Sequence, residues 1–564
     1  MLRREDVTAT YSKGRFVSAL GLALMLWLCP GHSNAANGFA VPGQEPPNIL
    51  FVLADDMGFA DAGCYGGEIA TPNLDRLAAN GVRFTQFYNC ARCWPTRAAL
   101  LTGYYPQQIR MDPPQGRLPG WARLLPTYLK PLGYRSYQSG KWHVNGAPNA
   151  LADGGFDRSY RLEDHDRNFY PQSLWLDDVR LPPVPRGSNY YTTVAFADFM
   201  ISCLKEHAAK FSGQPFFAYL AFTVPHFPLQ APPEDIARYR DRYLAGWDVI
   251  REQRHQRQLK MGLVNCALSD REPGEAPYWN LSEEELHQQI STNEVARAVA
   301  WDGLSEQQRR FQATKMAIHA AMIDRMDREI GRVLDQLRAM GALENTIVMF
   351  ASDNGASAEF LNRGDKHDPS AEPGSGGSFL CLGPGWSTAA NTPFRLHKSW
   401  VHEGGISTPL IVHWPKGIRA KGELRHAVGH VIDIVPTILE LAGAQSRPVW
   451  SGVEPPPFPG RSLVPALAKD APVPRDFLYF HHENNRALLI GDWKLVSKRP
   501  NTNDYALYDL SHDRCERVNL AANNPERIVS MAQHWEAIEA GSRALATQDT
   551  APRTKDKAGP GPMK

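Results

Sequence analysis

Four apolar runs, each followed at once by polar residues, constrain the fold of this chain most strongly. The runs occupy residues 48–54, 134–138, 216–224 and 346–351. Short apolar runs without alternation are typical of strands that helices bury on both faces. Apolar side chains from Met316 to Leu337 recur at helical spacing, and Gly341 follows as a stop signal. We therefore predict an α/β fold with a large, mixed, mostly parallel sheet flanked by helices.

The polar residues after the four runs suit metal binding and acid–base chemistry. They are Asp55 and Asp56, then Gly140 to His143 with Lys141, then Pro225 and His226, and last Asp353, Asn354 and Gly355. In open α/β sheets, ligands bind outside the carboxyl ends of the strands, so we expect these residues to meet in one cleft. Three carboxylates and an amide oxygen suit a hard divalent cation such as Ca²⁺ or Mg²⁺ better than Zn²⁺.

Each of these patterns also has an ordinary structural interpretation. Paired aspartates after a strand often form turns or cap helices, and Asp-Asn-Gly is usually a turn. A single Gly-Lys-Trp-His or Pro-His-x-Pro is more often structural than catalytic. The functional interpretation depends on their joint occurrence in one chain.

A more specific motif lies between the first and second of these groups. Residues 93–97 read Cys-Trp-Pro-Thr-Arg, and Leu101, Thr102 and Gly103 follow. This string resembles the Cys-x-Pro-Ser/Thr-Arg signature of formylglycine-dependent (type I) sulfatases of the alkaline phosphatase superfamily. The five motifs occur in the order that this family uses. Residues 71–84 and 391–412 are also similar to sulfatase segments, and the latter resembles the one that supplies the family's last active-site lysine, here Lys398.

The resemblance, closest to bacterial arylsulfatases, implies how the site works. In that family the cysteine is oxidised to formylglycine, whose hydrated aldehyde attacks a sulfate ester and is later regenerated. It implies a divalent cation, Ca²⁺ with Mg²⁺ as the alternative, and a substrate that is a sulfated small molecule or carbohydrate. The implied metal ligands are Asp55, Asp56, Asp353, Asn354 and modified Cys93. The implied catalytic residues are Cys93, Arg97, Lys141, His143, His226 and Lys398, with His226 as the acid for the leaving alcohol and His143 as the base that expels sulfate.

Two positions depart from the commonest family pattern, and two other functions remain open. Thr96 replaces the more frequent serine, and Trp94 fills a position usually given to a small residue. One alternative function is hydrolysis of phosphate or phosphonate esters on the same fold. The other is a protein that binds sulfated polymers without cleaving them, although all ten expected site residues are present.

Composition and the N-terminal segment indicate a secreted enzyme. The 564 residues carry a formal net charge of +1, which gives no reason to expect nucleic-acid binding. The pattern at the N-terminus predicts a signal peptide over residues 1–35. It consists of basic residues, then the apolar stretch 16–28 and then the small residues 33–36. An uncleaved anchor is the alternative. We expect a periplasmic or secreted protein whose partners are the secretion machinery and a formylglycine-generating enzyme.

The pattern along the chain predicts two structured regions. We expect a catalytic domain over residues 46–445, a proline-rich linker at 447–459 and a C-terminal subdomain over 460–548 with an antiparallel sheet and one helix. Residues 549–564 read as a disordered tail. The chain has eight cysteines, whose spacing fixes no disulfide pairing. Two segments are candidate pocket walls. They are residues 241–301, which form an insert relative to the motif-bearing segments, and residues 360–390.

Overall fold

The computed structural model describes residues 45–163, 167–363, 367–444, 454–501 and 503–548. All of them belong to one compact unit. The predicted signal peptide at 1–35 and the predicted tail at 549–564 lie outside the described residues, and so does most of the predicted linker at 447–459.

The core of the described chain is a ten-stranded sheet. Its strands, in spatial order, are β11 (Glu423–Arg425), β2 (Val82–Phe84), β10 (Leu410–His413), β9 (Thr346–Ser352), β1 (Asn48–Asp55), β8 (Phe216–Pro225), β4 (Arg135–Lys141), β5 (Arg158–Leu162), β6 (Leu174–Leu176) and β7 (Val179–Arg180). The four predicted strands are the adjacent, mutually parallel strands β9, β1, β8 and β4. Strand β4 continues to Lys141, so Lys141 lies within the strand rather than after it. The predicted mixed, mostly parallel sheet is confirmed.

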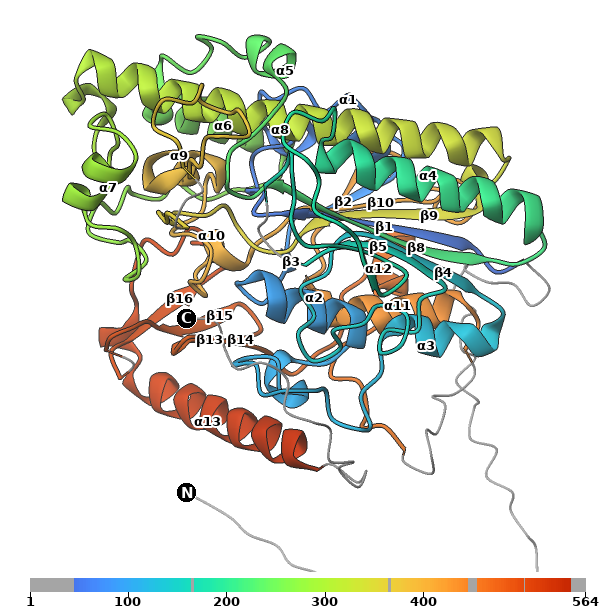
Figure 1. The fold of residues 1–564 in the computed structure, drawn as a ribbon. Helices are drawn as coiled ribbons and strands as arrows, with labels where there is room; N and C mark the ends of the chain where they lie inside the picture. Colours follow the sequence, from blue (N-terminus) through green and yellow to red (C-terminus); the bar gives the residue numbers. More distant parts are fainter. Residues whose placement is uncertain (1–44, 164–166, 364–366, 445–453, 502, 549–564) are drawn as a thin grey trace, which may run out of the picture. The chain divides into compact units, whose positions relative to one another are not determined.

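Helices cover both faces of this sheet (Figure 1). Along β1 the side chains of Leu50 and Val52 belong to one core and those of Ile49 and Phe51 to another, because successive residues of a strand point to opposite faces. The first core includes residues of α4 (Thr192–Lys210) and of α8 (Glu306–Ala339), the long helix that the 316–337 pattern predicts. The second includes residues of α2 (Cys93–Thr102), α3 (Leu125–Leu129) and α11 (Ile434–Leu441).

The remaining elements include the 16-residue helix α6, several shorter helices and two short strands. The helices are α1 (Pro72–Ala79), α5 (Pro233–Ala237), α6 (Gly246–Met261), α7 (Glu283–Gln289), α9 (Gly383–Ala390), α10 (Glu403–Ile406), α12 (Val464–Lys469) and α13 (Pro525–Thr547). Strands β3 (Phe87–Tyr88) and β12 (Gly429–His430) form a two-stranded sheet. No helix in the described part of the chain is both long enough and apolar enough to cross a membrane.

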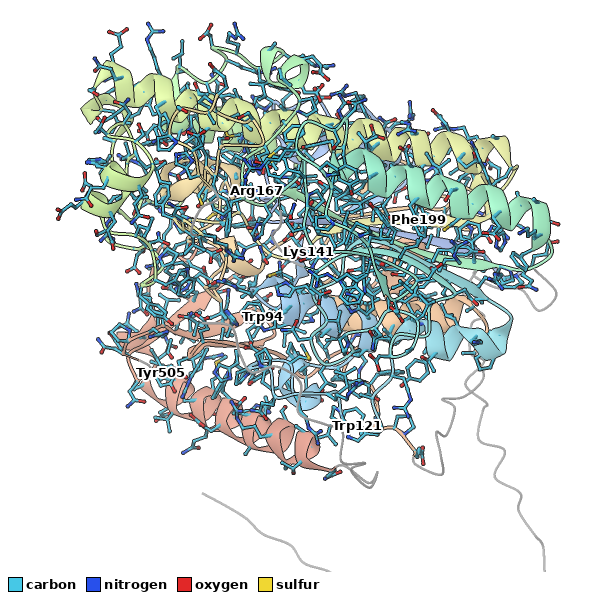
Figure 2. The ribbon with its side chains drawn as sticks, viewed as in Figure 1. Trp94, Trp121, Lys141, Arg167, Phe199 and Tyr505 are labelled. Carbon is cyan, nitrogen blue, oxygen red and sulfur yellow. A yellow bond between two sulfur atoms is a disulfide. The ribbon has the colours of Figure 1, made fainter. Side chains whose placement is uncertain are left out.

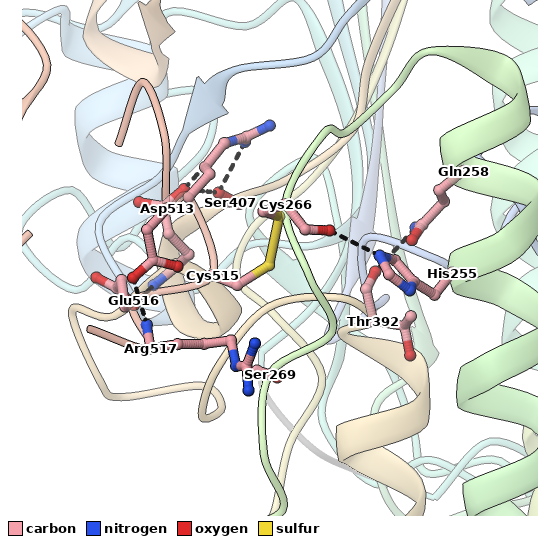
Figure 3. Close-up of a disulfide and its surroundings, with 12 residues drawn as sticks. His255, Gln258, Cys266, Ser269, Thr392, Ser407, Asp513, Cys515, Glu516 and Arg517 are labelled. Atoms are coloured by element: carbon pink, nitrogen blue, oxygen red, sulfur yellow. Dashed lines mark hydrogen bonds and ion pairs between the residues drawn. A yellow bond between two sulfur atoms is a disulfide. The ribbon is translucent and has the colours of Figure 1, made fainter. Parts of the chain in front are cut away.

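The C-terminal region forms the predicted antiparallel sheet and helix. Its strands are β13 (Leu478–His482), β14 (Asn485–Ile490), β15 (Trp493–Ser497) and β16 (Tyr505–Asp509), joined in sequence order. Leu488 and Leu495 of this sheet share a core with Leu100 of α2, so the small sheet is packed beside the helix that begins at Cys93. A disulfide between Cys266 and Cys515 also ties the segment after α6 to the C-terminal region (Figure 3).

Candidate active site

The carboxyl ends of β1 and β9 bring three carboxylates and an amide together. Asp55 is the last residue of β1, and Asp56 follows in the left-handed region with φ 63°. Beyond β9, the Asn354 side-chain amide donates to Asp56 Oδ1 at 2.6 Å, and Asp353 Oδ1 accepts from the Asp56 backbone N–H at 3.3 Å. All four side chains are buried. The predicted convergence of these two strand ends is therefore present.

Cys93 lies at the N-terminus of α2, whose later residues connect it to the strand ends. The helix begins at Cys93 itself, and Pro95 is its third residue. Proline is tolerated there because N–H groups in the first turn have no intrahelical acceptor. Arg97, one turn further on, donates to Asp353 Oδ2 at 2.9 Å and to the Lys141 carbonyl at 3.0 Å. A single guanidinium thus joins α2, β9 and β4.

Two buried lysines contact the carboxylates. Lys141 Nζ lies 2.7 Å from Asp55 Oδ2, and Lys398 Nζ lies 2.9 Å from Asp56 Oδ2. Burial alone would lower the pKa of Lys398, but the charges of Asp56 and Glu359 outweigh it and the pKa is raised. Lys398 therefore remains an ammonium despite its burial. Figure 2 labels Lys141 at the end of β4 and Trp94 on α2.

The two predicted histidines lie in different surroundings. His226 Nε2 is 3.2 Å from Lys398 Nζ and 3.5 Å from Asp56 Oδ2, so this imidazole belongs to the carboxylate and lysine cluster. His143 has φ 50°, and its ring centroid lies 5.7 Å from that of Trp94 in an edge-on contact. Trp94, the unusual residue of the cysteine motif, therefore packs against the predicted base.

The residues at the strand ends fit a divalent cation. Asp55, Asp56 and His226 each offer a ligand atom, and these atoms lie within 4.8 Å of one another. Asp55 Oδ1 and Asn354 Oδ1 are buried and have no hydrogen-bond partner among the described residues. Burial, followed by the charge of Asp55, raises the pKa of Asp353 well above its ordinary value. A cation would both satisfy the buried oxygens and relieve the crowding of like charges.

Two residues of the cluster carry no recognisable sequence signal. Glu359 Oε2 lies 3.0 Å from Lys398 Nζ, and Glu359 Oε1 lies 2.8 Å from the Arg92 guanidinium. The Arg92 guanidinium also lies over the ring of Trp94 at 5.2 Å and over that of Trp279 at 5.0 Å. Arg92 could only have been singled out by its place beside Cys93. Glu359 belongs to no motif, and only the fold brings it to Lys398.

The chain is a member of the alkaline phosphatase superfamily, to which sulfatases belong. The sequence comparison is more specific, because the family model described as Sulfatase matches residues 47–444. The chain belongs to the sulfatase family, and it is a sulfuric ester hydrolase. A second model, described as the C-terminal part of N-sulphoglucosamine sulphohydrolase, matches residues 394–540.

Individual relatives agree with this assignment. An uncharacterized sulfatase of Schizosaccharomyces pombe is 33% identical, over 90% of this chain and 96% of its own length. The arylsulfatase of Klebsiella aerogenes is 31% identical, over 72% of this chain and 89% of its own length. Among solved structures, Ps i-CgsB in complex with a neocarrahexaose is 22% identical and has the same fold, with a TM-score of 0.61 over 89% of this chain and 94% of that one. The predicted family and enzyme class are confirmed.

Proposed function

We propose that this protein hydrolyses sulfate esters with a nucleophile made by oxidation of Cys93, releasing inorganic sulfate and an alcohol or phenol. The main evidence for this proposal is the position of Cys93, which is buried at the N-terminus of α2. On the same helix, Arg97 donates to Asp353 Oδ2 at 2.9 Å, and the ring centroid of Trp94 lies 5.7 Å from that of His143. Position 93 therefore lies within about one helical turn of residues that contact the carboxylate cluster and the predicted base.

Two groups absent from the chain as synthesised would complete the site. Formylglycine at position 93 would supply the nucleophile, and a divalent cation held by Asp55, Asp56, Asp353, Asn354 and modified Cys93, Ca²⁺ or alternatively Mg²⁺, would supply Lewis acidity toward sulfate. The oxygen-rich donor set favours these hard cations over zinc.

The other residues have roles that follow from their charge and position. Lys141 and Lys398 are buried cations that can attract sulfate oxygens, and Arg97 fixes Asp353 and the backbone of Lys141. Asp353 would accept the proton of the attacking hydroxyl. His226, hydrogen-bonded to Lys398, would protonate the leaving alcohol, and His143 would remove the proton whose loss releases sulfate.

We propose a sulfated carbohydrate or a small sulfate ester as the substrate. Two of the structural neighbours are described in complex with a neocarrahexaose and with the substrate D-glucosamine-2-N,6-O-disulfate. The sulfate-binding cations and the carboxylates are equally compatible with phosphate esters, so substrate comparison is the decisive experiment.

The test is to produce the protein together with a formylglycine-generating enzyme and to assay 4-nitrophenyl sulfate against 4-nitrophenyl phosphate. We expect the sulfate to be the better substrate and Cys93→Ala to abolish turnover. Preference for the phosphate would assign the protein to phosphoryl chemistry instead. Equal activity of Cys93→Ala would exclude residue 93 as the nucleophile.

We also propose that the protein is exported to the periplasm or the exterior after removal of residues 1–35. The disulfide between Cys266 and Cys515 supports this, because disulfides persist in oxidising compartments. N-terminal sequencing of the mature protein should begin at Ala36. A mature protein that retains Met1 and stays in the reducing cytoplasm would contradict the proposal.

A further inference from the structure

A pocket of about 290 Å³ lies between the insert and the C-terminal sheet. Its aromatic walls are Tyr278 and Trp279 of the insert and Trp400. Its polar walls include Glu483 and Asn485, which come from the β13–β14 turn and the start of β14, and Arg499. The volume is close to the lower end of typical ligand pockets, about 300 Å³.

Two series of side-chain contacts connect this pocket to the catalytic cluster. Ser399, which lines the pocket, directly follows Lys398, and its hydroxyl accepts a hydrogen bond from Arg92 at 2.5 Å. Trp279 donates from its indole N–H to Glu359 at 3.1 Å, and Glu359 is the second carboxylate partner of Lys398. The pocket is thus adjacent to the part of the site where Lys398 and His226 meet. In the proposed mechanism, the alcohol would leave from the region around Lys398 and His226.

The rim of the pocket is exposed yet held in place. Tyr278 is 69% exposed, the highest value among the exposed large apolar side chains of the described residues. The Arg499 guanidinium lies 3.9 Å from the centroid of its ring, and the Trp279 ring meets it edge-on at 4.8 Å. An aromatic ring that is ordered by its neighbours but left open to solvent is a preorganised surface for a ligand.

The polar walls indicate a ligand that is rich in hydroxyl groups and carries little charge. Asn485 is buried and anchored by a hydrogen bond from its amide to the Ser399 carbonyl. Glu483 is 29% exposed, so its carboxylate can accept hydrogen bonds from a ligand. Arg499 lines the pocket together with Glu275 and Glu483, so the pocket carries charges of both signs rather than a cationic patch. A sugar ring fits such walls, because its C–H face packs on aromatic rings and its hydroxyls need acceptors.

We propose that the pocket bounded by Tyr278, Trp279, Glu483 and Arg499 is a subsite for a sugar ring on the leaving-group side of the sulfate ester. This inference rests on the proposed sulfatase function. The ring it binds belongs to the alcohol product or to the sugar unit attached to it. A neighbouring cavity of about 760 Å³ shares Glu275, Arg499 and Pro500 with the pocket and gives room for further units of an oligosaccharide.

The test uses full-length, aldehyde-bearing protein and three probes: 4-nitrophenyl sulfate, monosaccharide 6-sulfates and a sulfated galactan tetrasaccharide. The variants are Tyr278→Ala and Glu483→Gln, with Tyr278→Phe as the conservative partner. Val179→Ala is the matched control, because Val179 is 67% exposed and lies on edge strand β7, outside the residues that line the pocket. Thermal unfolding of each variant establishes that it is folded before KM and kcat are measured.

We expect Tyr278→Ala to raise KM for the best sugar sulfate about tenfold, which corresponds to one lost aromatic contact, and to change kcat little. The rise in KM should be smaller for 4-nitrophenyl sulfate, and Tyr278→Phe and Val179→Ala should behave as the parent protein. Unchanged KM for every sugar sulfate in Tyr278→Ala and Glu483→Gln would overturn the subsite. So would turnover of 4-nitrophenyl sulfate without turnover of any sugar sulfate. If aldehyde-bearing protein hydrolyses neither class, the proposed function itself fails.

Discussion

Lys398 is held by two buried carboxylates, and the second of these, Glu359, positions it rather than reacting. Glu359 also binds Arg92, so its loss would release two cations at once. We expect Glu359→Gln to lower kcat/KM about 10²-fold, the size of effect that a displacement near 1 Å can have. The control is Glu294→Gln, which disrupts another buried ion pair, with Lys315 at 2.7 Å. If both variants lose activity and stability alike, Glu359 has only a structural role.

Replacing each of the two histidines should impair a different step of the reaction. His226 contacts Lys398, whereas His143 packs on Trp94. His226→Ala should slow alkyl sulfates far more than 4-nitrophenyl sulfate, because only poor leaving groups need a proton. A general acid or base contributes about 10²–10⁴-fold, so both losses should be measurable.

His143→Ala should give a burst of about one alcohol per active site and then nearly stop, with sulfate retained on the protein, because a base that acts after bond cleavage affects only the release step. Rapid-quench assays that follow alcohol and sulfate separately would measure this. Simultaneous appearance of both products, without a burst, would remove His143 from the release step.

Metal removal should be visible in stability as well as in activity. The buried oxygens of Asp55 and Asn354 that lack hydrogen-bond partners would coordinate a bound cation. A cation that binds only the folded state raises the unfolding temperature. Chelation with EDTA should therefore lower both Tm and turnover, and Ca²⁺ should restore both. Asp56→Asn should weaken the response of Tm to Ca²⁺. A Tm that is the same with EDTA and with Ca²⁺ would argue against a cation at these residues.

At the scale of elements, the link between α10 and the C-terminal sheet is a buried ionic cluster. Lys494 of β15 lies 2.8 Å from both Glu403 and Glu516. Glu516 directly follows Cys515 of the Cys266–Cys515 disulfide (Figure 3). Burial raises the pKa of Glu516 to about 7, although Lys494 opposes the shift. Glu403 is compensated both by Lys494 and by Arg514 at 3.4 Å, whereas the charge of Glu403 disfavours ionisation of Glu516, so Glu516 is the carboxylate that retains a proton near neutrality.

This cluster predicts a pH dependence of stability. Between the unfolded pKa of glutamate, about 4.3, and the folded value near 7, the folded protein holds a proton that the unfolded chain has released. Stability from this group is therefore present at low pH and decreases as the pH rises through this window. Glu516→Gln should flatten the decrease in urea unfolding free energy between pH 5 and pH 7. Exposed Glu344→Gln is the control, and an unchanged slope in Glu516→Gln would refute the assignment.

The elements that the sequence predicts well are those whose signal is local. The strands over 48–55 and 346–352 and helix α8 follow from runs and periodicities within one segment. Strand β6 and the edge strand β7, of three and two residues, have no such signal, because they are short and all of their residues but Leu174 are partly or fully exposed.

At the scale of the whole molecule, the site is made of contacts between distant parts of the chain. The motifs predicted which residues meet, because strand ends in a parallel sheet share one edge. They did not predict Glu359, which belongs to no repeating pattern. Of the predicted pocket walls, the segment 241–301 contributes Tyr278 and Trp279 to the 290 Å³ pocket, whereas 360–390 contributes no residue to it, and Arg499 on its other side had no sequence signal. The carboxyl-end rule locates residues that follow strands, whereas Glu359, Tyr278 and Arg499 lie on loops whose course only the folded chain determines.

The chemical state of residue 93 is the central claim of this account. Trypsin cleaves after Arg92 and Arg97, so the peptide 93–97 isolates the residue. In protein purified by its ability to release sulfate, mass spectrometry should show this peptide with sulfur replaced by oxygen and two hydrogens lost, the mass of an aldehyde. The aldehyde should also react with a hydrazide probe, and turnover should scale with the aldehyde fraction. Full activity in protein whose residue 93 is entirely an intact thiol would contradict the account.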